Sequence, residues 1–241
     1  MTVLETHGLV AGYEPGLPIV RGASIRVARG ELVVVLGPNG AGKSTLIKAI
    51  AGLVPVEAGT VLLEGRPITS TPAHRMIGAG VGFVPQTDNV FQTMTVEEQL
   101  RLVAASLARP TRRPALAAVF ALFPDLARHR TSRNGSLSGG QRQMVAIASA
   151  LLSEPKVLLL DEPSAGLSPK MVQIVLDKLH DIRRSGVAVI MVEQNVRAAL
   201  AVADRGYVMV EGVERHAGTA AELMNDPVVA RLYLGRSVSA A

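Results

Sequence analysis

The sequence contains no cysteine and no tryptophan, and only three tyrosines and four phenylalanines among its 241 residues. The lack of cysteine excludes disulfide bonds and thiolate metal sites, so a cytosolic location is the expectation. The scarcity of aromatic rings argues against a platform that stacks the bases of single-stranded nucleic acid. Although the formal charge is +5, the basic residues are scattered along the chain. Nucleic acid is therefore not an expected partner.

Long hydrophobic runs are also missing. No stretch of about 18 or more apolar residues occurs, so no segment is expected to span a bilayer. The first residues do not combine a basic stretch with an apolar one, so no signal peptide is expected. Apolar residues nevertheless make up 48% of the chain, which is enough for a substantial core.

Three short apolar runs predict buried strands at residues 32–36, 157–160 and 187–192. Continuous apolar runs are typical of parallel strands that are covered on both faces. Between the last two runs, residues 171–184 place apolar side chains at helical spacing. Alternating strands and helices predict an α/β fold with a mainly parallel sheet.

Two further regions indicate antiparallel strands. The first thirty residues are expected to form strands joined by tight turns, as an N-terminal antiparallel β-subdomain. Residues 207–211 and 213–216, joined at Gly212, predict a hairpin.

The middle of the chain, residues 95–152, is rich in alanine and leucine and predicts a helical region. Pro110 and Pro114 are expected to break it, with Pro114 in the first turn of the next helix. The simplest account is an α-helical subdomain inserted into an α/β core.

We therefore expect one domain over residues 1–241. Its core is expected to comprise residues 1–86 and 156–241, and its helical subdomain residues 87–155. The tail after Gly235 is small and polar, and is expected to be loose.

A phosphate-binding loop is expected at residues 37–45, which fit the pattern G-x-x-x-x-G-K-S/T between a strand and a helix. Glycines let the backbone N–H groups point inward, and the helix N-terminus adds partial positive charge. Lys43 is expected to reach the β- and γ-phosphates of a nucleoside triphosphate, most simply ATP, and Ser44 to bind Mg²⁺. The alternative is a plain glycine turn, which the strand and helix context disfavours. The expected nucleotide-binding residues are Gly37, Pro38, Asn39, Gly40, Ala41, Gly42, Lys43, Ser44 and Thr45.

An acidic pair, Asp161 and Glu162, follows the apolar run at 157–160. The carboxyl end of a parallel strand faces the crevice where ligands bind. Asp161 is expected to hold Mg²⁺ through water, and Glu162 to orient or deprotonate an attacking water. The alternative is that both acids only cap or solvate the following turn.

A second helix start lies at residues 137–141, with the sequence Leu-Ser-Gly-Gly-Gln. Ser138 is a good N-cap, and the helix is expected to run to about Leu152. Its two glycines predict a second exposed group of N–H donors suited to a phosphate. The alternative is an ordinary capped helix.

On these residues the sequence resembles ATP-binding cassette (ABC) ATPases along essentially its whole length. Residues 37–45 resemble the Walker A loop and 157–162 the Walker B strand, while 137–141 are identical to the family signature. The resemblance implies a P-loop NTPase core and ATP hydrolysis. It also implies that Gln86 touches Mg²⁺ and reports to a membrane subunit, and that Tyr13 stacks on adenine.

The same resemblance implies a shared site. Two such subunits, identical or different, pack head to tail, so that ATP on one Walker loop also meets the other chain's signature. The residues concerned are Ser138, Gly139, Gly140 and Gln141. The implied partners are a second ATPase subunit, transmembrane permease subunits and, indirectly, a substrate-binding protein. The implied location is the cytoplasmic face of the membrane, as a peripheral subunit.

Within the family, the chain resembles the second ATPase subunit of importers for branched-chain amino acids, or the related urea and amide importers. The stretches that carry this resemblance are residues 94–98, 122–124, 192–195, 203–208 and 233–235. An exporter or lipid-transport ATPase is an alternative. A soluble switch protein is disfavoured, because no long coiled-coil insertion or second cassette is present.

Two positions depart from the family pattern. Most cassettes carry histidine where Gln194 stands, and an amide cannot take up a proton as imidazole does. We expect Gln194 to contact the γ-phosphate and to support slower hydrolysis; the alternative is that it only helps to start the next helix. Ser168 stands where aspartate is usual, so communication across the dimer is expected to differ.

Overall fold

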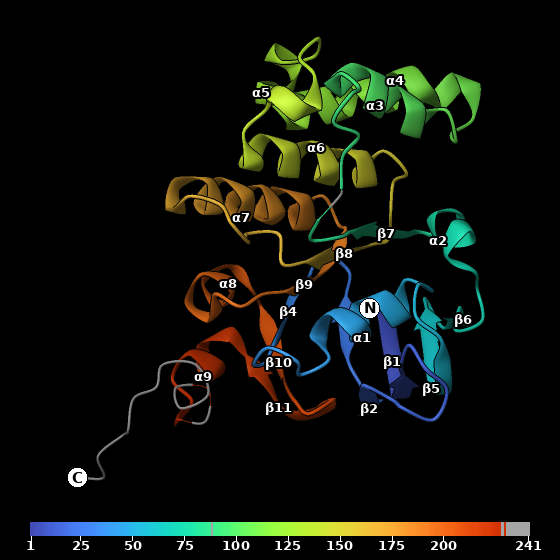
Figure 1. The fold of residues 1–241 in the computed structure, drawn as a ribbon, viewed down its shortest axis with the longest axis vertical. Helices are drawn as coiled ribbons and strands as arrows, with labels where there is room; N and C mark the ends of the chain where they lie inside the picture. Colours follow the sequence, from blue (N-terminus) through green and yellow to red (C-terminus); the bar gives the residue numbers. More distant parts are fainter. Residues whose placement is uncertain (88, 228, 230–241) are drawn as a thin grey trace.

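The computed structural model describes residues 1–87, 89–227 and 229. It contains two β-sheets and a group of helices, α3 to α6, that lies to one side of them (Figure 1). The expected tail after Gly235 and the stretch 233–235 lie outside the described residues.

The larger sheet has six strands within the described residues, in the order β11-β10-β4-β9-β8-β7. The four pairings from β10 to β7 are parallel, and only β10 and β11 pair antiparallel. This confirms the mainly parallel sheet and the hairpin at Gly212. The strands are β4 (Leu32–Leu36), β7 (Val81–Val84), β8 (Val157–Asp161), β9 (Ala188–Val192), β10 (Arg205–Val210) and β11 (Val213–Thr219).

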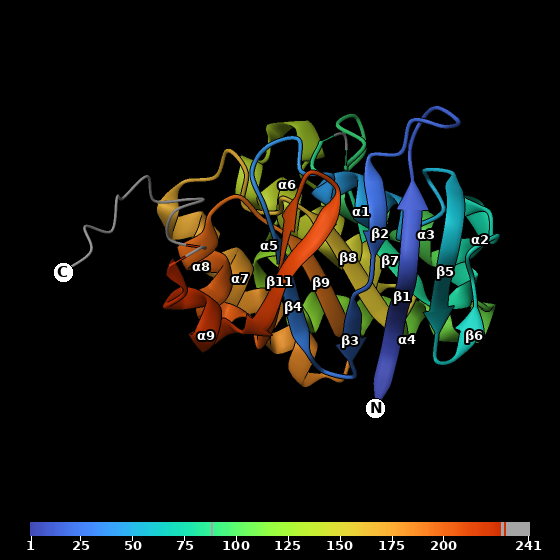
Figure 2. The same ribbon diagram turned by 90° about the horizontal axis from the view of Figure 1, so that it is seen from below.

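The second sheet is antiparallel and confirms the N-terminal β-subdomain. Its strands follow the order β2-β1-β5-β6, and β3 also pairs with β1. Figure 2 shows β1 and β5 on the side of the molecule away from α7, α8 and α9. The strands are β1 (Thr2–Ala11), β2 (Val20–Ala23), β3 (Arg26–Ala28), β5 (Val56–Leu63) and β6 (Arg66–Pro67).

Residues 95–152 are mostly helical, as expected. In the described residues, the helices are α1 (Lys43–Ile50), α2 (Ala73–Ala79), α3 (Val96–Ala104), α4 (Arg109–Leu122), α5 (Pro124–Arg128), a 3₁₀ turn η1 (Asn134–Ser136), α6 (Gly139–Leu151), α7 (Pro169–Arg184), α8 (Val196–Val202) and α9 (Ala220–Met224). None of them is long and apolar enough to cross a membrane. The expected boundaries of the helical subdomain at 87 and 155 stay a prediction.

The placement of Pro114 in the first turn of a helix was wrong. Helix α4 begins at Arg109, and Pro114 lies inside it. Pro110 takes the first turn instead, where a missing N–H costs no helical hydrogen bond. The Arg112 guanidinium helps this early start, because it donates to the carbonyls of Leu107 and Ala105 just before the helix.

The six-stranded sheet separates two apolar cores. Val34 and Leu36 of β4 face the core shared with the helical region, whereas Val33 and Val35 face the core shared with α1 and the antiparallel sheet. All five residues of β4, β8 and β9 are buried, since both faces of the sheet are covered. The carboxyl ends of these three strands therefore emerge side by side from a rigid support.

Candidate nucleotide site

The phosphate loop leaves β4 and enters α1 as expected. The N-cap of α1 is Gly42, at φ +91°, and no side chain caps the helix. The positive φ of Gly42 favours glycine, and a Cβ there would come within a tight 3.2 Å of the Ile19 carbonyl oxygen. The first turn of α1 also lacks acidic residues. Its N–H groups and its partial positive charge are thus left for an anion.

Lys43 is almost completely buried at this helix start. Its Nζ donates to the carbonyl oxygens of Gly37 (2.7 Å) and Pro38 (3.0 Å). Burial lowers the pKa of Lys43, and the nearby carboxylates Glu162 and Asp161 oppose that effect. A buried ammonium whose hydrogen bonds go to two neutral carbonyls is well suited to a phosphate, which would accept charge-assisted hydrogen bonds from it.

Ser44 and Asp161 form the second part of the site. The Ser44 hydroxyl donates to Asp161 Oδ1 at 2.7 Å, and Asp161 is only 2% exposed. Burial raises the pKa of Asp161, while the Ser44 hydrogen bond and Lys48 oppose the rise. Lys48 Nζ lies 3.9 Å from Asp161 Oδ2 and was not predicted. The sequence did contain a signal for this contact: Lys48 is four residues after Ser44, so both lie on one face of the helix.

The Ser44 hydroxyl and the Asp161 carboxylate are oxygen groups of the kind that suits Mg²⁺. Within the described part of the chain, no group of three or more His, Cys, Asp and Glu side chains could hold a metal ion. Mg²⁺ typically takes one or two protein ligands and completes its shell with water and substrate phosphates. Ser44 and Asp161, next to the phosphate loop, fit that pattern.

Glu162 is held by two glutamine amides. Gln86 Nε2 donates to its Oε2 at 2.8 Å, and Gln194 Nε2 lies 2.8 Å from both carboxylate oxygens. Gln86 follows β7, Glu162 follows β8 and Gln194 comes shortly after β9, so three neighbouring strands place them. Glu162 also has φ +47°, a conformation that costs energy in a residue other than glycine.

The structure thus joins six predicted residues: Lys43, Ser44, Gln86, Asp161, Glu162 and Gln194. Gln194 bonds to Glu162, whereas the helix start after it is capped by the side chain of Asn195. The idea that Gln194 only starts the helix is therefore disfavoured. Its contact with a γ-phosphate stays a prediction.

The signature residues lie outside this group. Ser138 caps α6: its hydroxyl accepts from the Gln141 N–H, and Gln141 Oε1 accepts from the Ser138 N–H at 2.9 Å. Within the described residues, neither bonds to the phosphate-loop group. Ser138 and Gly139 are exposed, as a second phosphate site requires. That exposure was wrongly predicted for Gly140, which is buried because the Met171 side chain of α7 covers it.

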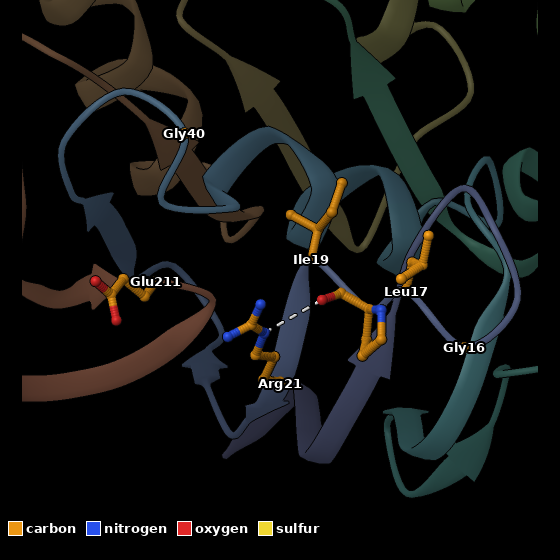
Figure 3. A pocket seen from close by; sticks show the side chains of 7 residues that line it. Gly16, Leu17, Ile19, Arg21, Gly40 and Glu211 are labelled. Carbon is orange, nitrogen blue, oxygen red and sulfur yellow. Dashed lines mark hydrogen bonds between the residues drawn. The ribbon is translucent and has the colours of Figure 1, made fainter.

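A cavity of about 640 Å³ opens beside the phosphate loop at Gly40 (Figure 3). Its other lining residues come from the chain before β2, from β2 itself and from the turn between β10 and β11; they are Gly16, Leu17, Pro18, Ile19, Arg21 and Glu211. Arg21 Nε donates to the Pro18 carbonyl at 3.3 Å across it. Tyr13 is 55% exposed and does not line this cavity, so its stacking on adenine stays a prediction.

The unusual Ser168 is the N-cap residue of α7, yet its hydroxyl makes no capping hydrogen bond. It lies at the end of the turn that starts at Glu162. The effect on communication across a dimer stays a prediction.

The chain is similar to ATP-binding proteins of two kinds of transport system. The chain is 40% identical to a probable branched-chain amino acid transport ATP-binding protein, LivF, of Archaeoglobus fulgidus, over 97% of this chain and 99% of that protein. It is 38% identical to BraG, a high-affinity branched-chain amino acid transport ATP-binding protein of Pseudomonas aeruginosa, over 94% of this chain and 97% of that one. It is also 36% identical to the lipopolysaccharide export system ATP-binding protein LptB of Acidithiobacillus ferridurans, over 97% of this chain and 97% of that protein.

Solved structures agree with the fold. A nucleotide-free ATP-binding cassette from an ABC transporter superposes with a TM-score of 0.86 at 26% identity, over 98% of this chain and 100% of that chain. The cbiO1 protein of Clostridium perfringens, part of an ABC transporter complex, gives 0.84 at 28% identity, over 95% of this chain and 93% of that one.

A sequence model of the ABC transporter family matches residues 20–165. This segment runs from β2 through the phosphate loop and the signature helix to the turn after Glu162. This match, the relatives and the cassette fold show that the chain belongs to the ABC transporter family, as an ATP-hydrolysing, ATP-binding subunit.

Proposed function

We propose that this chain is the ATPase subunit of an importer for branched-chain amino acids. The similarity to LivF and BraG over nearly the whole chain carries the proposal. The related urea and amide importers remain close alternatives. A lipid exporter is a second candidate, because LptB proteins are 36% identical.

In this proposal the triphosphate of ATP lies on residues 37–45. Lys43 binds the β- and γ-phosphates, and the free N–H groups at the start of α1 bind the phosphate oxygens. Ser44, Asp161 and Gln86 hold Mg²⁺, which neutralises phosphate charge. The buried, desolvated Lys43 and the Ser44–Asp161 hydrogen bond support these roles.

Glu162 orients the attacking water or takes its proton. The position of Glu162 supports this role. Two amides hold its carboxylate, and Lys43 and Asp161 each lie close enough to Glu162 to interact with it electrostatically. Gln194 keeps Glu162 in place and contacts the γ-phosphate. The signature of a second subunit, through Ser138, Gly139, Gly140 and Gln141, completes the site.

An apolar groove supports attachment to a permease. It has a volume of about 220 Å³ and lies between α2, β7, α3 and α6. Leu53 and Ile77 line it and are each about half exposed. Apolar side chains left in water at a groove are typical of a protein interface. We propose that permease subunits dock here and hold the chain at the cytoplasmic face of the membrane, while a substrate-binding protein acts from the other side.

Co-purification from the native host tests the transport class. Two permease-type membrane subunits and a binding protein that selects branched-chain amino acids would support the proposal. A binding protein for urea or amides, or a lipid-export complex, would overturn the amino acid assignment. The ATPase assignment would survive either result.

Glu162→Gln tests the catalytic role. The amide keeps the size of the side chain but cannot accept a proton, so turnover should fall by about a hundredfold or more. ATP should still bind and should hold two subunits together, measured by size-exclusion chromatography with ATP. Turnover like that of the unchanged protein would remove Glu162 from the mechanism.

Gln194→His tests the departure from the family. If the glutamine slows hydrolysis because it cannot exchange a proton, the histidine variant should turn over a few-fold faster in the assembled transporter. ATP turnover at saturating ATP measures this. A fall in turnover would contradict the interpretation.

A further inference from the structure

Glu193 is a buried carboxylate without a cationic partner among the described residues. It follows the last residue of β9 and precedes Gln194, and it is 3% exposed. Burial raises its pKa, while hydrogen bonds from the Ser164 and Gln194 segments oppose the rise. Burying a carboxylate is costly unless hydrogen bonds compensate, so the contacts it makes indicate its role.

Both carboxylate oxygens accept from backbone N–H groups. Oε1 accepts from the Ser164 N–H at 2.9 Å, and Oε2 accepts from the Gln194 N–H at 3.3 Å. Ser164 belongs to the turn after β8, and Gln194 to the turn after β9. One side chain therefore ties together two turns that come from neighbouring strands of the sheet.

These two turns carry the proposed catalytic groups. Ser164 is two residues beyond Glu162, in a turn closed by the bond from the Ala165 N–H to the Glu162 carbonyl (3.1 Å). The Glu162 N–H in turn donates to the Val192 carbonyl at 3.0 Å. Since Glu162 has a left-handed backbone conformation, surrounding bonds must hold it in place. The Val192 carbonyl fixes the backbone at Glu162 itself, and the Glu193 carboxylate fixes it two residues later, at Ser164.

We propose that Glu193 is a positioning residue for ATP hydrolysis. Its two oxygens are taken up by backbone N–H groups, so it sets the backbone that aims Glu162 and the backbone of Gln194, whose amide holds Glu162. The same turn continues through Ser168 into α7, so Glu193 also links the Glu162 carboxylate to the segment expected to meet a second subunit. This inference rests on the proposed role of Glu162.

Three substitutions separate the reach of the side chain from its charge. Glu193→Gln keeps the reach and one acceptor oxygen, for the Ser164 N–H, and gives up only the longer 3.3 Å bond from the Gln194 N–H. Glu193→Asp keeps the charge but is one methylene shorter. Glu193→Ala removes both. A control on a different part of the chain is Glu31→Gln. Glu31 lies between β3 and β4 and accepts from the Ala28 N–H (2.6 Å), and it also pairs with Arg205 (2.5 Å).

The test measures ATP turnover of the full chain, alone and with the membrane subunits that co-purify with it. The binding of ADP, followed by titration calorimetry, and the melting temperature are measured beside it. We expect Glu193→Ala and Glu193→Asp to lower kcat about tenfold or more, because a small misplacement of a catalytic group is costly. KM and the Kd for ADP should stay within about twofold, since the phosphate loop is untouched. Glu193→Gln should stay within about threefold of the unchanged protein, and Glu31→Gln should lower only the melting temperature.

Unchanged kcat in Glu193→Ala, or equal loss in the Gln and Asp variants, would overturn the proposal. So would a parallel rise in KM and Kd, which indicates a general loss of structure. If the Ala variant does not fold, the comparison of kcat between Glu193→Gln and Glu193→Asp tests the proposal. Glu162→Gln is measured alongside: normal turnover there would overturn the role of Glu162 and with it this inference, whereas loss there with normal Glu193 variants would overturn this inference alone.

Discussion

The two glycine-containing helix starts differ in how their N–H groups are satisfied. At α1 the N-cap is Gly42, no side chain caps the helix, and a buried Lys43 lies beside it. At α6 the Ser138 hydroxyl and the Gln141 amide form a reciprocal capping box, a hydrogen-bonded cap that stabilises a helix without a ligand. The first site needs an anion to satisfy it, and the second does not.

This difference suggests that the starts of α1 and α6 have different functions. The start of α1 is arranged for an anion, since no side chain caps it and its first turn has no acidic residue. The start of α6 is already stable, so any contact that Ser138 makes with a nucleotide on a second subunit must compete with its own cap. We therefore expect the signature to contribute to turnover more than to nucleotide affinity.

The largest expected effect comes from Lys43→Ala. It removes the buried positive charge at α1, so ATP turnover should fall by about a hundredfold or more, and ATP affinity should fall with it. Turnover at saturating ATP and titration calorimetry measure the two effects. Retention of both would show that α1 does not depend on this charge, and the contrast with α6 would fail.

Gly140→Ala should have the next largest effect, on stability. An added Cβ would lie 2.2 Å from Met171 Cε, so the free energy of unfolding should fall by about 1–3 kcal/mol from overpacking. Gly139→Ala is the matched control, because its nearest contact would be an ordinary 3.4 Å from Leu167. Urea denaturation measures both variants. Equal stability would mean that Met171 moves aside freely and that Gly140 is not needed for packing.

Ser138→Ala should have the smallest effect on stability. Loss of the N-cap should lower the free energy of unfolding by about 1 kcal/mol. Thr95→Ala removes the same kind of capping box from α3 and should cost a similar amount. Turnover of the assembled transporter should fall only in the Ser138 variant. Equal turnover in the two variants would mean that Ser138 is a cap and nothing more.

Short-range features of the site were predictable. The strand at 32–36, the loop at 37–45 and the helix that follows depend on an apolar run, on glycines and on residues a few positions apart. Lys43 bonds to Gly37, only six residues earlier. The capping of α6 by Ser138 is similarly local.

Contacts across the sheet were not predictable. Gln86 meets Glu162 from 76 residues away, and Glu193 meets Ser164 from 29 residues away. Both depend on the order in which β7, β8 and β9 lie in the sheet. The burial of Gly140 beneath Met171 depends likewise on how α7 packs against α6. No role was predicted for Glu193, because residues 192–195 were noted only for their resemblance to a subfamily of cassettes.

The local pattern of the sequence determined a glycine loop, a lysine, a serine and two acids at the site, while the two glutamines were implied by the resemblance to the family. It did so because backbone conformation and helix capping are set by residues close together in the chain. Only the tertiary structure decided that two amides donate hydrogen bonds to Glu162 and that Lys48 approaches Asp161. It also decided that Glu193 connects two turns. The physical reason is that these contacts depend on strand order and on burial, which follow from the packing of the whole chain.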